Sequence, residues 1–119
     1  MRESSFGDVP AFEVDVREVE GGIAFEFFRE EGWLWFKRRV PNEIFELSVH
    51  MKGGVPQLWV IESPVLRRVT VTYGSVPAGF VQKIPHTGKP PMLEAGTTYY
   101  VSARGGGIGA RAFTVGKFR

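Results

Sequence analysis

The chain has 119 residues, of which 43% are hydrophobic and 24% charged, and its net charge is +2. A chain of this length and composition can bury a core of its own in one domain, which excludes an intrinsically disordered protein. It contains no cysteine, so disulfides, thiol nucleophiles and cysteine-ligated metal centres are excluded. Ten phenylalanines, fifteen glycines and eight prolines favour short β-strands separated by turns.

The first ten residues differ from the rest of the chain. Residues 1–10 are polar and are expected to form a loose lead-in, whereas residues 11–119 are expected to form a single domain. The lead-in lacks the apolar run of a signal peptide, and no stretch approaches the ~20 apolar residues of a membrane span. We therefore expect no transmembrane segment.

Alternation of apolar and polar residues predicts short strands along the whole chain. Residues 12–17 and 23–28 predict a hairpin that turns at residues 20–22. Residues 30–32 predict a second turn, and residues 33–40 are either a third strand, which we favour, or an aromatic loop. Further strands are expected at residues 45–51, 58–61, 68–73, 80–84, 98–103 and 110–115. This pattern predicts an all-β antiparallel sandwich, with a small β-barrel as the alternative.

A corner and a strand near the C-terminus carry a family resemblance. In the pattern Leu-x-x-Gly-Thr-x-Tyr-x-Val-x-Ala, Leu93, Gly96 and Tyr99 resemble the E to F corner of fibronectin type III domains. The resemblance implies a Greek-key β-sandwich of seven to eight strands, fibronectin III-like or immunoglobulin-like. It also implies that the Tyr99 ring lies in the core while its hydroxyl reaches back to the backbone of the corner.

A second resemblance covers about half of the chain. Residues 69–82, the Pro90-Pro91 pair with the corner that follows, and Trp59-x-Ile61 are similar to a pattern in small uncharacterised bacterial proteins, many of them envelope proteins or lipoproteins. This implies a periplasmic or cell-envelope location, with a cytoplasmic one as the alternative. A lipoprotein begins with a signal and an acylated cysteine, so the implication applies only to a mature domain.

Few residues are candidates for catalysis or metal binding. His50 and Glu46 share one side of a predicted strand and could offer two metal ligands, but two ligands do not make a site. His86 lies in a loop rich in proline and glycine. The sequence therefore predicts no catalytic, cofactor-binding or metal-binding residue, and we expect that the protein is not an enzyme.

One cluster combines aromatic and basic side chains. It consists of Trp33, Trp35, Phe36, Lys37, Arg38 and Arg39. On a surface, the indoles could stack on sugar rings or on the bases of single-stranded nucleic acid, and the cations could hold an anion. In a regular strand, Trp33 and Trp35 would instead share one face and fill the core. Nucleic acid is not favoured, because the chain carries little net positive charge.

Charge is divided unevenly along the chain. Residues 1–62 carry seven basic and twelve acidic side chains, whereas residues 63–119 carry eight and one. We expect ion pairs between neighbouring strands of the two halves to consume much of this difference. An anion-binding face on the basic half is the alternative.

These observations predict a non-enzymatic binding or interaction module that presents loops or a sheet edge to a partner. The alternative function is a carbohydrate-binding module that uses Trp33 and Trp35, and a small enzyme or metal site comes third. The partner would be a protein or a polysaccharide, and the chain is expected to be a monomer or a weak homodimer through an unprotected sheet edge.

Overall fold

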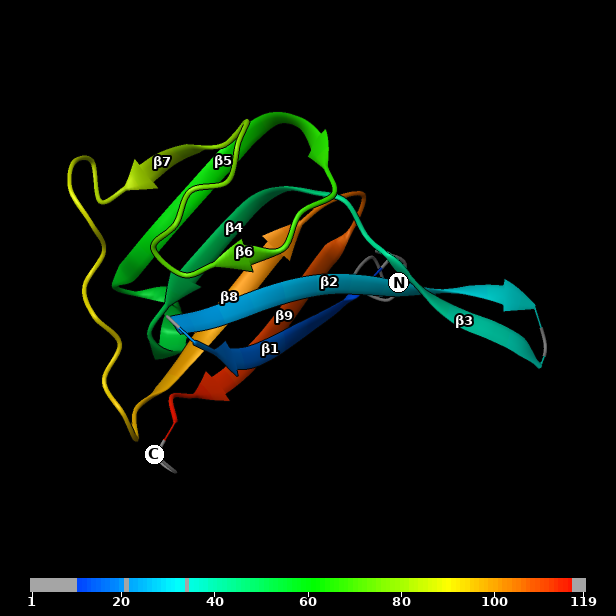
Figure 1. The fold of residues 1–119 in the computed structure, drawn as a ribbon, viewed down its shortest axis with the longest axis horizontal. Helices are drawn as coiled ribbons and strands as arrows, with labels where there is room; N and C mark the ends of the chain where they lie inside the picture. The colour runs from blue at the N-terminus through cyan, green and yellow to red at the C-terminus, as the bar shows by residue number, and fades with distance from the viewer. Residues whose placement is uncertain (1–10, 21, 34, 117–119) are drawn as a thin grey trace, which may run out of the picture.

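The computed structural model describes residues 11–20, 22–33 and 35–116, so the expected lead-in at residues 1–10 lies outside the described part. Nine strands run through this part (Figure 1). They are β1 (Glu13–Val19), β2 (Gly22–Trp33), β3 (Phe36–Pro41), β4 (Ile44–His50), β5 (Gln57–Arg67), β6 (Val71–Thr72), β7 (Val81–Ile84), β8 (Thr98–Arg104) and β9 (Ile108–Thr114). A short 3-10 turn, η1 (Lys52–Gly54), connects β4 to β5.

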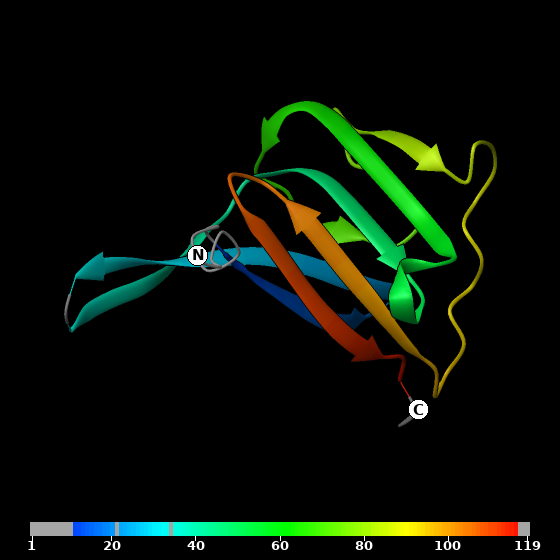
Figure 2. The same ribbon diagram turned by 180° about the vertical axis from the view of Figure 1, so that it is seen from behind.

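The strands form two antiparallel sheets. One sheet has the order β1-β2-β3, with β6 also paired to β2, and the other has the order β7-β5-β4-β8-β9. Figures 1 and 2 view the molecule from opposite sides, and both show the two sheets facing each other. The all-β prediction is confirmed, and the barrel alternative is wrong, because the strands divide into two sheets. We refer to the two facing sheets as the body.

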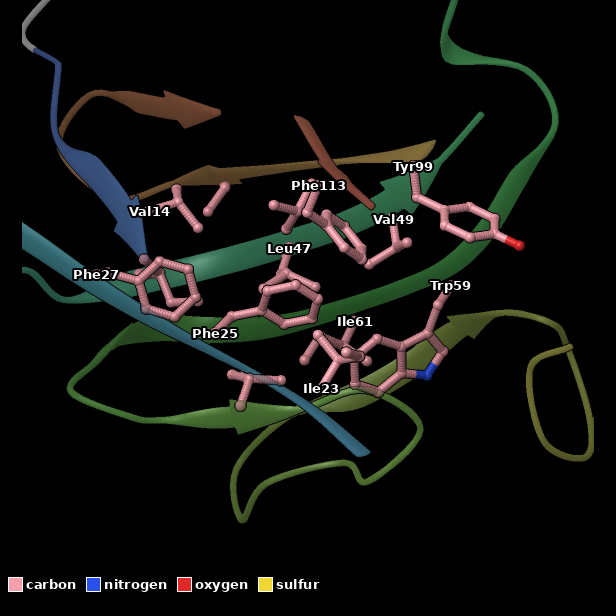
Figure 3. Close-up of a cluster of buried hydrophobic side chains, with 14 of the residues drawn as sticks. Val14, Ile23, Phe25, Phe27, Leu47, Val49, Trp59, Ile61, Tyr99 and Phe113 are labelled. Atoms are coloured by element: carbon pink, nitrogen blue, oxygen red, sulfur yellow. The ribbon is translucent and has the colours of Figure 1, made fainter. Parts of the chain in front are cut away.

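Alternate side chains of both sheets meet in one core (Figure 3). Phe25 of β2 lies edge-on against Phe113 of β9, with ring centroids 5.6 Å apart. Trp59 of β5 is fully buried and packs edge-on against Tyr73 at 5.3 Å. The predicted one-sided run of β8 is confirmed, because Tyr99, Val101 and Ala103 are all buried.

The predicted turn at residues 30–32 is wrong. Strand β2 continues through these residues to Trp33, and β3 begins at Phe36 rather than at residue 33. Glu30 lies opposite Arg39 and Glu31 opposite Arg38, and oppositely charged cross-strand neighbours favour a continued ladder. Gly32 adopts a φ of 127°, which a side chain would resist.

Strand β5 is much longer than the strand predicted at residues 58–61. It runs from Gln57 to Arg67, because its pairing with β4 resumes at Arg67 opposite Ile44.

Two other strands also differ from the predicted pattern. The pairing of β4 with β5 slips between Ile44 and Glu46, and as a consequence Ile44 is fully buried while Phe45 is only half-buried. A bulge shifts the side-chain alternation by one residue, which a regular two-residue pattern cannot anticipate. The strand expected at residues 68–73 is reduced to Val71–Thr72.

Among residues 11–20, 22–33 and 35–116, no helix has the length and apolarity required to cross a membrane.

Candidate functional site

The most prominent surface feature is a two-stranded hairpin that extends beyond the body. Strand β2 pairs with β1 from Gly22 to Phe28, and from Phe28 to Trp33 it pairs with β3. Residues 29–33 and 35–40 therefore continue as a hairpin past the end of the β1 pairing, and we call them the arm. Figures 1 and 2 both show the arm projecting from one end of the molecule.

The end of the arm exposes three large aromatic side chains. Trp33 is 74% exposed, Trp35 81% and Phe36 75%, so the indoles are not part of the core. Trp33 and Phe36 are cross-strand partners, which places them on the same side of the hairpin, and Trp35 lies in the turn. We call these three residues the tip. An aromatic cluster held away from the body is typical of a contact surface.

Arg39 of the predicted cluster holds the base of the arm to the body. Its guanidinium lies 3.0 Å from a carboxylate oxygen of Glu13 and 3.0 Å from one of Asp15, both on β1. The hydrogen bond to Asp15 raises the pKa of Arg39 above its ordinary value. The same guanidinium lies 4.2 Å above the Phe28 ring. Arg39 is therefore an anchor, whereas Lys37 and Arg38 are exposed beside the tip.

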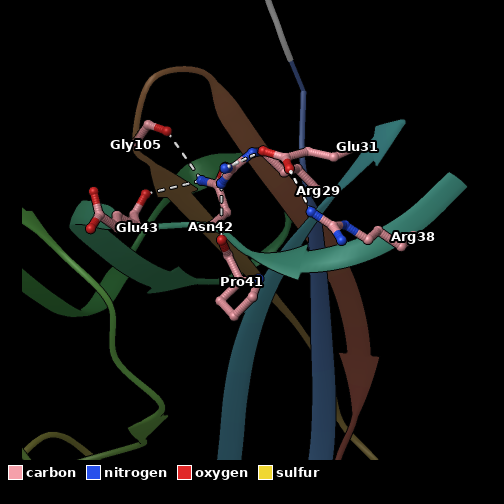
Figure 4. A network of polar contacts seen from close by, with 7 residues as sticks. All are labelled: Arg29, Glu31, Arg38, Pro41, Asn42, Glu43 and Gly105. Atoms are coloured by element: carbon pink, nitrogen blue, oxygen red, sulfur yellow. Dashed lines mark hydrogen bonds and ion pairs between the residues drawn. The ribbon is translucent and has the colours of Figure 1, made fainter. Parts of the chain in front are cut away.

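A second polar network fixes the other side of the arm base (Figure 4). Arg29 donates to the Pro41 carbonyl oxygen at 2.9 Å and to a carboxylate oxygen of Glu31 at 2.6 Å. Asn42 is buried, and its amide donates to the carbonyl oxygens of Glu43 at 2.9 Å and Gly105 at 3.1 Å. Gly105 lies between β8 and β9 of the other sheet. The arm base thus contacts both sheets, which sets the direction of the arm.

The corner residues singled out in the sequence lie at the start of β8. The backbone N–H of Glu94 donates to the Tyr99 hydroxyl oxygen at 2.9 Å. Gly96 has a φ of 85°, and its N–H donates to the Val115 carbonyl oxygen at 3.1 Å. Leu93 packs against the edge of the core. These contacts place the corner in the body and away from the arm.

A groove of about 760 Å³ lies at the end of the body opposite the arm. It combines the β1–β2 turn, the segment after β6 and the proline-rich loop before β8. Its lining is Glu18, Val19, Glu20, Gly22, Ile23, Tyr73, Gly74, Lys89, Pro90, Pro91, Met92, Leu93 and Val115. The sequence prediction missed this groove, and the Pro90-Pro91 pair in a long loop was the one local signal for it.

One hydrogen bond fixes the proline-rich loop at the groove. The Tyr73 hydroxyl donates to the Pro91 carbonyl oxygen at 2.8 Å. Burial raises the pKa of Tyr73 to about 12, so the hydroxyl keeps its proton and remains a donor at neutral pH. This wall of the groove is therefore held against the core.

The histidines do not gather at either feature. The His50 ring stacks on Tyr100 with centroids 6.0 Å apart, and its Nδ1 lies 3.0 Å from the Met51 carbonyl oxygen. His86 is exposed in its loop. Within the described residues, no three side chains of histidine, aspartate or glutamate gather as a metal site would require.

Ion pairs between the two halves of the chain are fewer than expected. Of seven ion pairs among the described residues, two join the halves: Arg104 with Glu46 at 3.4 Å, and Arg111 with Asp15 at 3.9 Å. The other five lie within residues 1–62. The acidic half thus pairs mainly within itself.

Comparison with known proteins gave no match: no family model, no curated protein and no solved structure matches this chain.

Proposed function

We propose that the protein is a non-enzymatic binding module that engages a protein partner through the tip of its arm. The observation that carries this proposal is the exposure of Trp33, Trp35 and Phe36, each at least 74% exposed at the free end of the arm. Aromatic side chains are the residues that most often dominate protein interfaces, because each buries a large rigid surface. Leaving three of them in water is unfavourable unless a partner covers them.

The arm also has the geometry of a presented binding element. Both networks at its base hold the arm at a fixed angle to the body, through Arg39 on one side and Asn42 on the other. A preorganised element loses less conformational entropy when it binds than a flexible loop does. The body then serves as a rigid support for the tip.

The scaffold is, in this proposal, a fibronectin III-like or immunoglobulin-like Greek-key sandwich. Two observations support it: the strands divide into two antiparallel sheets, and the Tyr99 hydroxyl accepts from the Glu94 N–H as in a tyrosine corner. The periplasmic or envelope location in bacteria is likewise a proposal, and its support is the sequence resemblance given above.

A carbohydrate-binding module is the second candidate, and one observation favours it. Trp33 and Phe36 lie on the same side of the arm as the cross-strand pair of Glu31 and Arg38. Aromatic rings next to polar groups could stack on a sugar ring and hydrogen-bond its hydroxyls. Retention of the wild-type chain, and not of the Trp33→Ser/Trp35→Ser variant, on insoluble polysaccharides would support this candidate over the protein partner.

Site-specific photo-crosslinking in bacterial cells tests the proposed function. The full chain is produced with a benzophenone amino acid in place of Trp35, or, as the control, in place of Val65, which is 52% exposed on β5. We expect irradiation to give protease-sensitive adducts from position 35 that position 65 does not give. No protein adduct from position 35, or the same adducts from both positions, would contradict the proposal.

A further inference from the structure

We propose that the partner of the arm is a second copy of this chain, and that the tip of one copy docks in the groove of the next. This inference rests on the proposed function of the tip as a binding element. It adds the identity of the partner and the surface that receives the tip.

The positions of tip and groove exclude docking within one molecule. Strand β2 has 12 residues; Gly22 and Ile23 at its start line the groove, and Trp33 at its end belongs to the tip. An extended strand rises about 3.3 Å per residue, so the two sites lie more than ~30 Å apart along one rigid element. Figures 1 and 2 show the arm and the proline-rich loop at opposite ends of the molecule. The tip can therefore reach only the groove of another molecule.

The walls of the groove suit aromatic side chains. Pro90, Pro91 and Tyr73 present rigid apolar surfaces, and the loop and turn beside them expose Met92 by 90% and Val19 by 38%. Indole rings pack favourably on such surfaces, and a methionine adapts its shape to an aromatic partner. The groove volume of about 760 Å³ lies in the range that accepts a compact ligand. Both surfaces are thus apolar patches that the other could cover.

Charge gives the docking a direction. Lys37 and Arg38 follow the tip directly on β3, and Glu18 and Glu20 line the groove. Lys89 also lines the groove, so among the described lining residues the acidic groups exceed the basic ones by one. With the tip inserted, its cations would approach the acidic β1–β2 turn of the other copy. Such complementarity orients an encounter and weakens as salt screens it.

The expected contact is small and therefore weak. Three aromatic side chains offer about 500 Å² of surface in all, and an equal area of groove brings the buried total to roughly 1,000 Å². An interface of this size is at the lower limit for stable association, and we expect a dissociation constant on the order of micromolar. The surfaces in contact are different on the two copies, so each copy keeps a free tip or a free groove, and association continues into open chains or closes as a ring.

Sedimentation velocity on purified full-length chains tests this inference. The arm variant carries Trp33→Ser, Trp35→Ser and Phe36→Ser, and the groove variant carries Glu18→Lys and Glu20→Lys; all five positions are exposed, so we expect both variants to fold. The wild type should grow beyond a dimer as concentration rises. Each variant alone should remain monomeric, or associate at least tenfold more weakly, because the arm variant lacks a functional tip and the groove variant lacks a functional groove. In their mixture, the unchanged tip of the groove variant can dock in the unchanged groove of the arm variant, where its cations still face Glu18 and Glu20.

The mixture of the two variants is therefore the most informative sample. We expect it to form a one-to-one dimer and nothing larger, because one tip and one groove remain functional between the two variants. A groove variant that associates as strongly as the wild type would overturn the inference in favour of tip-to-tip pairing. A wild type that stays monomeric at all concentrations would overturn it as well.

The outcome also separates this inference from the proposed function. If the purified wild type stays monomeric while position 35 still gives protein adducts in cells, the tip binds a different protein and only the self-association is wrong. If position 35 gives no protein adduct, both proposals are wrong.

Discussion

The backbone N–H of Glu94 donates a hydrogen bond of 2.9 Å to the hydroxyl oxygen of Tyr99, which ties the corner before β8 to a ring buried in the core. Replacing Tyr99 by phenylalanine leaves this N–H without its acceptor. We expect Tyr99→Phe to lower the free energy of unfolding by about 1 kcal/mol. Urea denaturation measures the change, and Tyr100→Phe on the opposite side of β8 is the control. Equal losses in the two variants would show that the corner bond contributes nothing of its own.

The three tryptophans should report two different environments. Trp59 is fully buried and donates to Gln82 at 2.8 Å, whereas Trp33 and Trp35 are exposed. At a concentration where the chain is monomeric, Trp33→Ser/Trp35→Ser should remove a red-shifted, easily quenched emission and change stability by no more than about 0.5 kcal/mol. Trp59→Phe should remove the blue-shifted emission and destabilise by about 1–3 kcal/mol. Acrylamide quenching and urea denaturation measure both effects, and a large stability loss on changing the tip would contradict its exposure.

The stability of the protein should fall at high pH through Tyr73. Its pKa rises from 10.0 to about 12 on folding, mainly because the hydroxyl is taken out of water. Above pH 10 the unfolded chain ionises first, so this contribution to stability is complete below pH 10 and is lost as the pH rises toward 12. Tyr73→Phe should remove this part of the pH dependence. The tyrosinate absorbance of wild type and variant gives the check: the wild-type titration should contain a late phase near pH 12 that the variant lacks.

Gly32 should matter for the arm and not for the body. A Cβ at this position would overlap the carbonyl oxygen of Phe36, across the hairpin. We expect Gly32→Ala to distort the tip and weaken self-association at least tenfold, with little change in the unfolding midpoint. Gly53→Ala is the control, because Gly53 also has a positive φ, 83°, but no atom near its missing Cβ. Gly53→Ala should lower the free energy of unfolding by about 1 kcal/mol, because alanine disfavours a positive φ, and it should leave association unchanged.

The strands of the body were predictable because each buries one face. Alternation at Phe12, Val14 and Val16 and at Tyr99, Val101 and Ala103 indicates which residues share a side. Where a bulge intervenes, as beside Phe45, the alternation shifts and the prediction fails. Strand pairing over long sequence distances, such as β2 with β6, leaves no local pattern to predict it from.

The arm was predictable in composition but not in conformation. Glu30, Glu31 and Gly32 resemble a turn because charged residues and glycine are typical of turns, yet here the glutamates pair across the hairpin with arginines. In the sequence, the two glutamates precede the aromatic residues and the two arginines follow them, and this order was the available signal for a hairpin. Alternation alone could not decide whether Trp33 faces a core or water, because it gives the side of a strand and not what covers it. The groove could not be predicted, since its residues come from separate segments.

The most direct measurement is a crosslink map of the purified chain. With the benzophenone amino acid at position 35, a concentrated sample is irradiated and the junction peptides are identified by mass spectrometry. We expect crosslinks between two copies, from position 35 of one to the groove residues around Pro90 and Met92 of the other. Excess arm variant, whose groove is intact, should compete for the labelled tip, and the groove variant should not. Crosslinks confined to the arm, or scattered over the body, would contradict the docking of tip in groove.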